Sequence, residues 1–219
     1  MAAFGAIVSA VLAAFLGGIH RAYREEGRAT TMTLRVAAIT AFWLGLLALL
    51  IGSGRLATLP LSGLPFFFGS VAGVSLLVGL SPLGGRLAAG VPLAALIAFQ
   101  AFRLPLELVL HAWAAQGTVP ETMTWSGRNW DIFSGIVALM AFPFGTRHRS
   151  VAWAANIIGF ALFLNVIRVA LLSSPVPFGW HLERPLLLAL HLPYALIGPV
   201  CVGGALIGHL VLTRALLRH

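Results

Sequence analysis

An acid and a base stand four residues apart in the longest hydrophilic stretch of the sequence, residues 100–131. They are Glu107 and His111, and residues four apart share one face of a helix. Arg103 lies on the same face if a single helix continues through it, although Pro105 removes a backbone donor and clashes with the preceding turn. A short second helix that begins at Pro105 is the alternative. Two interpretations stay open: the polar stripe of an interfacial or re-entrant helix, and an acid/base pair or ligand set.

A second pair of polar residues lies inside an apolar stretch, residues 151–173. Asn165 and Arg168 are three apart and therefore share a helix face. An arginine at mid-membrane costs roughly 2.5–3.5 kcal/mol on insertion scales, so its guanidinium usually finds a partner or water. Arg168 either extends to the nearby outer surface, or projects inward to hold a carboxylate or an oxyanion while Asn165 fixes its orientation.

Three further polar residues lie in apolar stretches. His191 stands in the first turns of the last one, and it is either a packing residue or a functional base. His209 has no ionisable neighbour in its stretch, so we expect it to be structural. Asn156 faces away from Asn165 on a common helix, which is typical of a residue that packs one helix against another.

The elements that must position these side chains are membrane-spanning helices. Of the 219 residues, 59% are hydrophobic and only 9% are charged, and the mean hydropathy is +0.97. Soluble domains carry about 25% charged residues. We therefore expect one all-helical integral membrane domain over residues 1–219, a bundle of apolar helices that each cross a hydrocarbon core of about 30 Å. The seven expected spans are 3–19, 34–52, 64–80, 87–103, 131–146, 151–173 and 186–212.

Arginine placement predicts the orientation of these spans. The chain has 14 arginines and no lysine, spread through short loops. With the N-terminus outside and the C-terminus in the cytoplasm, nine arginines fall in cytoplasmic segments. Four fall outside, namely Arg55, Arg103, Arg128 and Arg184. Cytoplasmic loops are enriched in basic residues, so this count favours a multi-pass protein of the bacterial cytoplasmic membrane.

The net charge of +8 has the same explanation. The arginines form no cluster on a polar surface, and we expect membrane lipid, whose headgroups attract basic loops, and no nucleic acid among the partners of this chain.

In this topology the polar side chains fall at one membrane depth, near the outer side. Random placement would scatter them, so we expect them to line one outer cavity. The set is Arg103, Glu107, His111, Arg128, Asp131, Asn165, Arg168 and His191.

The order of features in residues 125–195 resembles the exosortase/archaeosortase family of multi-pass membrane transpeptidases. That family has a Cys-Ser-Gly segment at the outer start of one span, an Asn-x-x-Arg near the outer end of the next, and a His near the start of a later one. The corresponding segments here are Phe133-Ser134-Gly135, Asn165-Val166-Ile167-Arg168, and His191. Residues 125–213 are also similar to bacterial integral membrane proteins of unknown function that carry a Gly-Arg-Asn-Phe/Trp-Asp-Ile stretch.

The resemblance implies roles for these residues. Arg168, His191 and Ser134 would be the catalytic set, with Asn165 beside them on the substrate. The remaining residues of the expected outer cavity, Arg103, Glu107, His111, Arg128 and Asp131, are candidates for substrate contact because of their common membrane depth. Phe133 occupies the position of the family's nucleophilic cysteine, and a phenyl ring can neither ionise nor attack a carbonyl. Ser134 could act as nucleophile only if a base such as His191 reached it, so whether this chain is an enzyme stays open.

Several functions therefore remain as hypotheses. The first is an exosortase-like protein that recognises or processes the C-terminal sorting tail of an exported protein. The others are a non-catalytic membrane scaffold and a carrier for a small anion, with Arg103, Arg128 and Arg168 as its binding ring. No HExxH-type pattern is present, and we predict no metal and no cofactor.

Overall fold

The computed structural model describes residues 1–58 and 63–218, and every regular element in these residues is helical. Helix makes up 76% of the structure, with no strand in the described part, which confirms the all-helical expectation. The elements are α1 (Ala2–Ala22), α2 (Ala29–Gly52), α3 (Arg55–Thr58), α4 (Gly63–Leu80), α5 (Pro82–Gly90), α6 (Leu93–Phe99), η1 (Gln100–Phe102), α7 (Arg103–Ala115), η2 (Glu121–Met123), α8 (Ile132–Ala141), α9 (Arg149–Ser173), η3 (Leu188–Leu190), η4 (Tyr194–Ile197), η5 (Gly198–Val202) and α10 (Gly203–Leu217).

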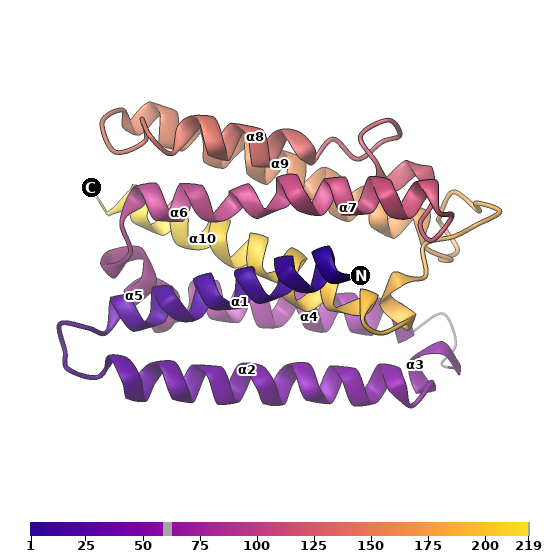
Figure 1. Cartoon of the computed structure of the whole chain (residues 1–219), viewed down its shortest axis with the longest axis horizontal. Helices are drawn as coiled ribbons and strands as arrows, with labels where there is room; N and C mark the ends of the chain where they lie inside the picture. The colour runs from indigo at the N-terminus through magenta and orange to yellow at the C-terminus, as the bar shows by residue number, and fades with distance from the viewer. Residues whose placement is uncertain (59–62, 219) are drawn as a thin grey trace.

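The long helices lie lengthwise beside one another, with the end of α10 at one end of the bundle and the start of α1 in its other half (Figure 1). α10 runs through the middle and packs against α4, α5, α6 and α9. α1 packs against α2, while α8 packs against α7 and α9. α1 and α2 run antiparallel, and so do α8 and α9 (Figure 1), which is the arrangement that short loops between apolar segments favour.

Five helices are long and apolar enough to cross a membrane. A sixth crossing is formed if the bent pair Phe67–Leu80 and Pro82–Gly90 counts as one span. α8 is apolar but has only ten residues, which is about 15 Å of helix. The five long helices are Ala2–Ala22, Ala29–Gly52, Leu93–Ala115, Arg149–Ser173 and Tyr194–Leu217.

The expected span 87–103 is displaced toward the C-terminus, and the reason lies at two prolines. α4 ends at Leu80, and Ser81 caps α5 by accepting a hydrogen bond from the Leu83 amide at 3.1 Å, with Pro82 in the favoured first position. α5 bends by 57° from the preceding helix and is not a new span. The next span starts only after Pro92.

Pro105 does not interrupt that next span. The helix passes through a 3₁₀ turn at Gln100–Phe102 and continues as α7. Such a turn changes the hydrogen-bond pattern just where the proline ring would clash with the preceding turn. Leu93–Ala115 is therefore one apolar helix, so Glu107 lies within a candidate span and not on a separate interfacial helix.

The last apolar stretch also differs from the expected span 186–212. Its first residues form the short turn η3 and irregular backbone, and the long helix begins at Tyr194. His191 follows η3 in extended backbone. It therefore precedes the last spanning helix instead of lying in its first turns.

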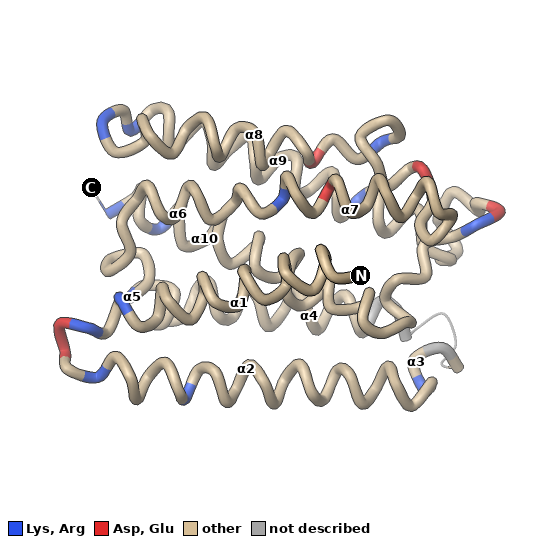
Figure 2. Tube along the Cα trace, viewed as in Figure 1, with Lys and Arg blue, Asp and Glu red and all other residues tan. Residues whose placement is uncertain are grey.

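Most charged residues lie at the two ends of the bundle, with a few near its middle (Figure 2). α2 exposes large apolar side chains along its length, including Ile39 at 68% and Phe42 at 75%. α9 does the same at Ile157 and Leu164. Monomeric soluble proteins rarely expose apolar surface on this scale, so these flanks are suited to contact with lipid.

Candidate functional site

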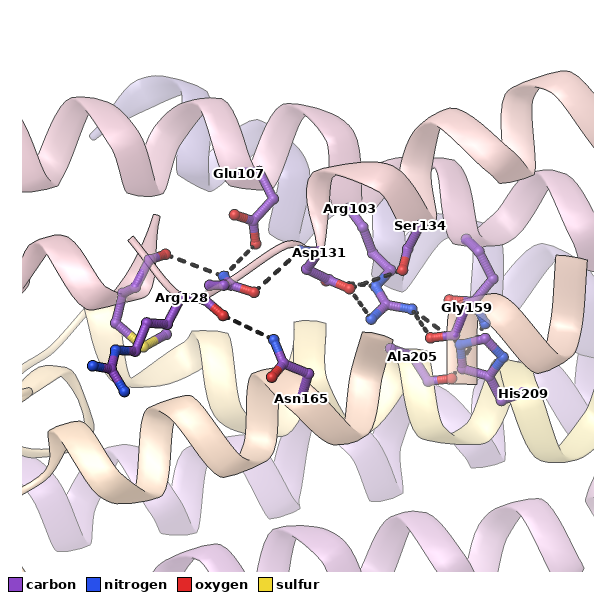
Figure 3. Close-up of polar contacts among 12 residues, drawn as sticks. Arg103, Glu107, Arg128, Asp131, Ser134, Gly159, Asn165, Ala205 and His209 are labelled. Atoms are coloured by element: carbon purple, nitrogen blue, oxygen red, sulfur yellow. Dashed lines mark hydrogen bonds and ion pairs between the residues drawn. The ribbon is translucent and has the colours of Figure 1, made fainter. Parts of the chain in front are cut away.

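Arg103 and Asp131 form an ion pair in the interior of the bundle. Arg103 lies near the middle of the Leu93–Ala115 helix and is only 2% exposed. Its Nε donates to Asp131 Oδ2 at 2.6 Å, and its Nη2 donates to Asp131 Oδ1 (Figure 3). Two parallel bonds between a guanidinium and a carboxylate are the strongest form of this contact. Arg103, expected in an outer segment, is thus a buried mid-span residue.

The other terminal nitrogen of Arg103 reaches two further helices. Nη1 donates to the Gly159 carbonyl of α9 at 3.0 Å and lies 3.0 Å from His209 Nε2 of α10. Since a guanidinium only donates, His209 Nε2 accepts, and the ring proton sits on Nδ1. That nitrogen lies 2.8 Å from Asn156 Oδ1, so it donates there.

Asn156 extends the chain of bonds along α10. Its Nδ2 donates to Thr213 Oγ1 at 2.7 Å, and the Thr213 hydroxyl donates to the His209 carbonyl at 2.8 Å. Each donor atom in this series of hydrogen bonds has an acceptor. We call the residues Arg103, Asp131, His209, Asn156 and Thr213 the buried polar chain.

Asn129 joins Glu107 to this chain. Its Nδ2 donates to Glu107 Oε1 at 2.9 Å and to the Met123 carbonyl at 3.1 Å, and its Oδ1 accepts from the Asp131 amide at 3.2 Å. Asn129 is 0% exposed. It ties down the irregular backbone before α8, which is possible inside a membrane protein only where protein covers it.

Two buried oxygens keep unused hydrogen-bonding capacity. Among the described residues, Gln100 Oε1 and Glu107 Oε2 have no partner. Gln100 also lines a void of about 10 Å³ together with Ser134 and His209. A void of that size holds about one water molecule.

Ser134 is part of the buried cluster, not a free nucleophile. Its Oγ donates to Asp131 Oδ1 at 2.9 Å, and the residue is 2% exposed. Serine attacks a carbonyl only when a base takes its proton. The neighbouring carboxylate of Asp131 is already held by Arg103 through both oxygens, so it is poorly placed for that task.

Arg168 and Asn165 lie on the surface of the bundle. Arg168 Nη2 donates to Asn165 Oδ1 at 2.8 Å, and Asn165 Nδ2 donates to the Arg128 carbonyl at 2.9 Å. Asn165 thus contacts Arg168 as in the inward-projecting alternative. Arg168 is exposed, so its guanidinium extends to the surface and not into an interior cavity. Arg128 stacks over Trp180, with its guanidinium carbon 4.6 Å from the ring centre.

The other two candidate site histidines, His111 and His191, belong to neither of these two groups. His111 is exposed and stacks on Trp125, with ring centres 4.1 Å apart, while Glu107 on the same helix is buried. His191 is exposed as well, and its side chain makes no hydrogen bond to any residue that the structure describes.

The polar residues expected in one cavity are therefore divided. The structure brings Glu107, Asp131, Arg103 and Ser134 together in the interior, and it places Arg128, Asn165 and Arg168 in a second, exposed group. It does not bring Arg168 to Ser134. The expected anion ring is not assembled either, because Arg103 is occupied by Asp131.

Comparisons with protein-family models, with curated proteins and with solved structures found no match for this chain. The geometry of its own residues must therefore carry the functional argument.

Sequence reasoning missed the part that α9 and α10 play in the site. Asn156 was expected to pack helices together and does so. His209 was expected to be structural, but its bond to Arg103 was not foreseen. The signal that could have revealed this contact is that Asn156 and His209 are isolated polar residues on two apolar helices, and that Thr213 follows His209 by one helical turn. Asn129 carried no signal by itself, because polar residues are ordinary in a loop.

Proposed function

We propose that this chain is an exosortase-like protein of the bacterial cytoplasmic membrane that binds the C-terminal sorting tail of an exported protein without cleaving it. The exposed pair Asn165 and Arg168 is the tail-binding element. The buried polar chain is its rigid support.

One observation carries the proposal: the Arg168 guanidinium is held in place and yet exposed. Asn165 engages one of its N–H groups at 2.8 Å, and a guanidinium has five. The other donors of Arg168 are suited to a carboxylate or to backbone carbonyls, which arginine binds in a fork geometry. Holding the side chain beforehand lowers the entropy lost on binding.

The proposal includes the topology. If α8 is counted with the six long crossings, the chain crosses the membrane seven times and its ends lie on opposite sides. In this topology nine arginines fall on the side of the turn between α1 and α2, and Arg55, Arg128 and Arg184 fall on the other side. Basic residues mark the cytoplasmic side. This orientation puts the N-terminus and the Arg168 region outside, where an exported protein would meet them.

The absence of cleavage follows from the residues at the family's nucleophile position. Phe133 offers no nucleophile, and it is 54% exposed on the flank of α8. The Ser134 hydroxyl is bonded to Asp131 and not to a histidine. A small-anion carrier has less support, because the buried Arg103 is already neutralised by Asp131.

The test is co-expression with an exported reporter fused to a candidate C-terminal sorting tail. We expect the reporter to co-purify with the wild-type chain at full length. Arg168→Ala should reduce its recovery at least fivefold, and Arg168→Lys should restore it only in part, because an ammonium lacks the fork.

Arg184→Ala is the matched control, since Arg184 is an exposed arginine at the same end of the bundle. Equal recovery with Arg168→Ala and Arg184→Ala would overturn tail binding. Reporter cleavage that disappears in Ser134→Ala would overturn the non-catalytic part.

A further inference from the structure

A cavity of about 670 Å³ lies among α1, α2, α4, α5, α6 and α10, separate from the polar residues described above. Its lining is hydrocarbon and glycine backbone, with the exceptions of Arg21, Thr40, Trp43 and Ser75. The Ser75 hydroxyl is satisfied, because it donates to the Val71 carbonyl at 2.7 Å. The interior of the cavity therefore suits an apolar occupant.

The size and opening of the cavity narrow the choice of occupant. Ile39 lines the cavity and is 68% exposed, so the cavity opens on the flank beside α2. Ligand pockets have volumes of roughly 300–1,000 Å³. A membrane-spanning helix about 10 Å wide and 30 Å long fills roughly 2,400 Å³, so a protein helix is too large to be enclosed. Apolar cavities do not hold water, whereas a hydrocarbon chain from the bilayer fits.

The charges at one end of the cavity indicate the headgroup. Arg21 lines the cavity at the end of α1, and its neighbours across the turn to α2 include Arg24 and Arg28. The acids of that turn are Glu25 and Glu26, and Glu26 is engaged by Arg86. Arginine remains in excess there (Figure 2), which favours a negatively charged headgroup.

We propose that this cavity binds an acyl chain of an anionic glycerophospholipid from the leaflet at the arginine-rich end of the bundle, with Arg21 on its phosphate. The site lies at the opposite end from Arg168. It is therefore independent of tail binding.

The experiment uses the purified full chain in detergent, freed of lipid and then given palmitoyl-oleoyl phosphatidylglycerol or the phosphatidylcholine with the same chains. Bound lipid is counted by native mass spectrometry, and the thermal midpoint is measured in parallel. We expect one tightly retained phosphatidylglycerol and a higher midpoint. Arg21→Gln should weaken phosphatidylglycerol binding roughly fivefold, since one arginine near a headgroup contributes about 1 kcal/mol, and weaken phosphatidylcholine binding less, because the choline cation of that lipid offsets its phosphate charge. Arg24→Gln should change less.

Two variants fill the cavity from different walls. Ala14→Phe on α1 and Ala95→Phe on α6 replace lining residues and should abolish the retained lipid. Ala13→Phe is the matched control, because Ala13 is exposed but does not line the cavity. If both filling variants lose the lipid, the loss is due to the filled cavity and not to misfolding of one variant. Retention in both filling variants at the level of Ala13→Phe would overturn the site. Equal binding of the two lipids, unchanged by Arg21→Gln, would overturn the headgroup assignment.

Discussion

Arg103 and Asp131 place a full charge pair inside an apolar bundle, which is costly unless every polar group is satisfied. Arg103 and Ser134 donate hydrogen bonds to the two Asp131 carboxylate oxygens, and Arg103 Nη1 donates to the Gly159 carbonyl and to His209 Nε2. The pair thus links α7, the start of α8, α9 and α10. Its physical role is to fix how these helices sit against each other.

Breaking this pair should be far more damaging than removing an exposed charge. Asp131→Asn leaves the Arg103 charge buried and unpaired, and we expect a loss of about 3–5 kcal/mol in unfolding free energy, measured as a lower thermal midpoint in detergent. Glu121→Gln, an exposed carboxylate, is the control. Arg103→Met combined with Asp131→Asn should cost less than the sum of the single changes. A midpoint for Asp131→Asn equal to that of Glu121→Gln would contradict the role assigned to the pair.

At the scale of single residues, the sequence predicted which polar residues are unusual for their apolar surroundings, but not which of them contact one another. Arg103, Glu107 and Asp131 were expected in one site, and they lie in one cluster. Asn165 and Arg168 were expected to share a helix face, and in the structure they form a hydrogen bond, as residues three apart on a helix can. Partners separated by many residues, such as His209, depend on the rotation of whole helices, which spacing along the chain does not determine.

Among the elements, α8 is the one whose position the site depends on most. It is short, and Gly135 brings its backbone against α7. A Cβ at Gly135 would lie 2.5 Å from the Leu104 nitrogen, next to Arg103 in the chain. The close approach places Asp131, one turn earlier on α8, opposite the guanidinium.

Gly135→Ala should therefore push α8 away from α7. Overpacking against backbone costs about 1–3 kcal/mol, and the thermal midpoint should fall accordingly. Gly69→Ala is the control, because a Cβ there meets nothing within 4 Å, and it should leave the midpoint unchanged or slightly raised. If the two variants have the same midpoint, the packing of α8 on α7 is looser than we describe.

Element boundaries were predictable where apolar length alone decided them. α1, α2 and α9 lie close to the expected spans 3–19, 34–52 and 151–173. The effect of each proline on the helix boundaries was harder to predict. Pro82 and Pro92 bound a bent helix and not a span, and Pro105 is absorbed by a 3₁₀ turn. Whether a proline ends a helix depends on how neighbouring turns satisfy the freed carbonyl, and that is settled by tertiary packing.

At the scale of the whole molecule, the distribution of charge and apolar surface is typical of a membrane protein. Most charged residues lie at the two ends of the bundle (Figure 2), the flanks expose apolar side chains, and Arg103 and Asp131 pair in the interior. The low share of charged residues, 9%, predicted the apolar flanks, but it did not predict the ion pair in the interior.

The proposed seven-crossing topology depends on α8, since it requires the residues before and after α8 to lie on opposite sides of the membrane. Gln116 caps the end of α7, before α8 begins, and Thr146 follows α8; both residues are exposed. Cys201 is 1% exposed and can be replaced by alanine to give a background without cysteine.

The most direct measurement is labelling of Gln116→Cys and Thr146→Cys, each in the Cys201→Ala background, with a membrane-impermeant maleimide on right-side-out vesicles. We predict that the cysteine at position 116 is labelled at once and that the one at position 146 is labelled only after permeabilisation. Labelling of both from the same side would mean that α8 does not cross, and it would contradict the topology on which the outer tail-binding site rests.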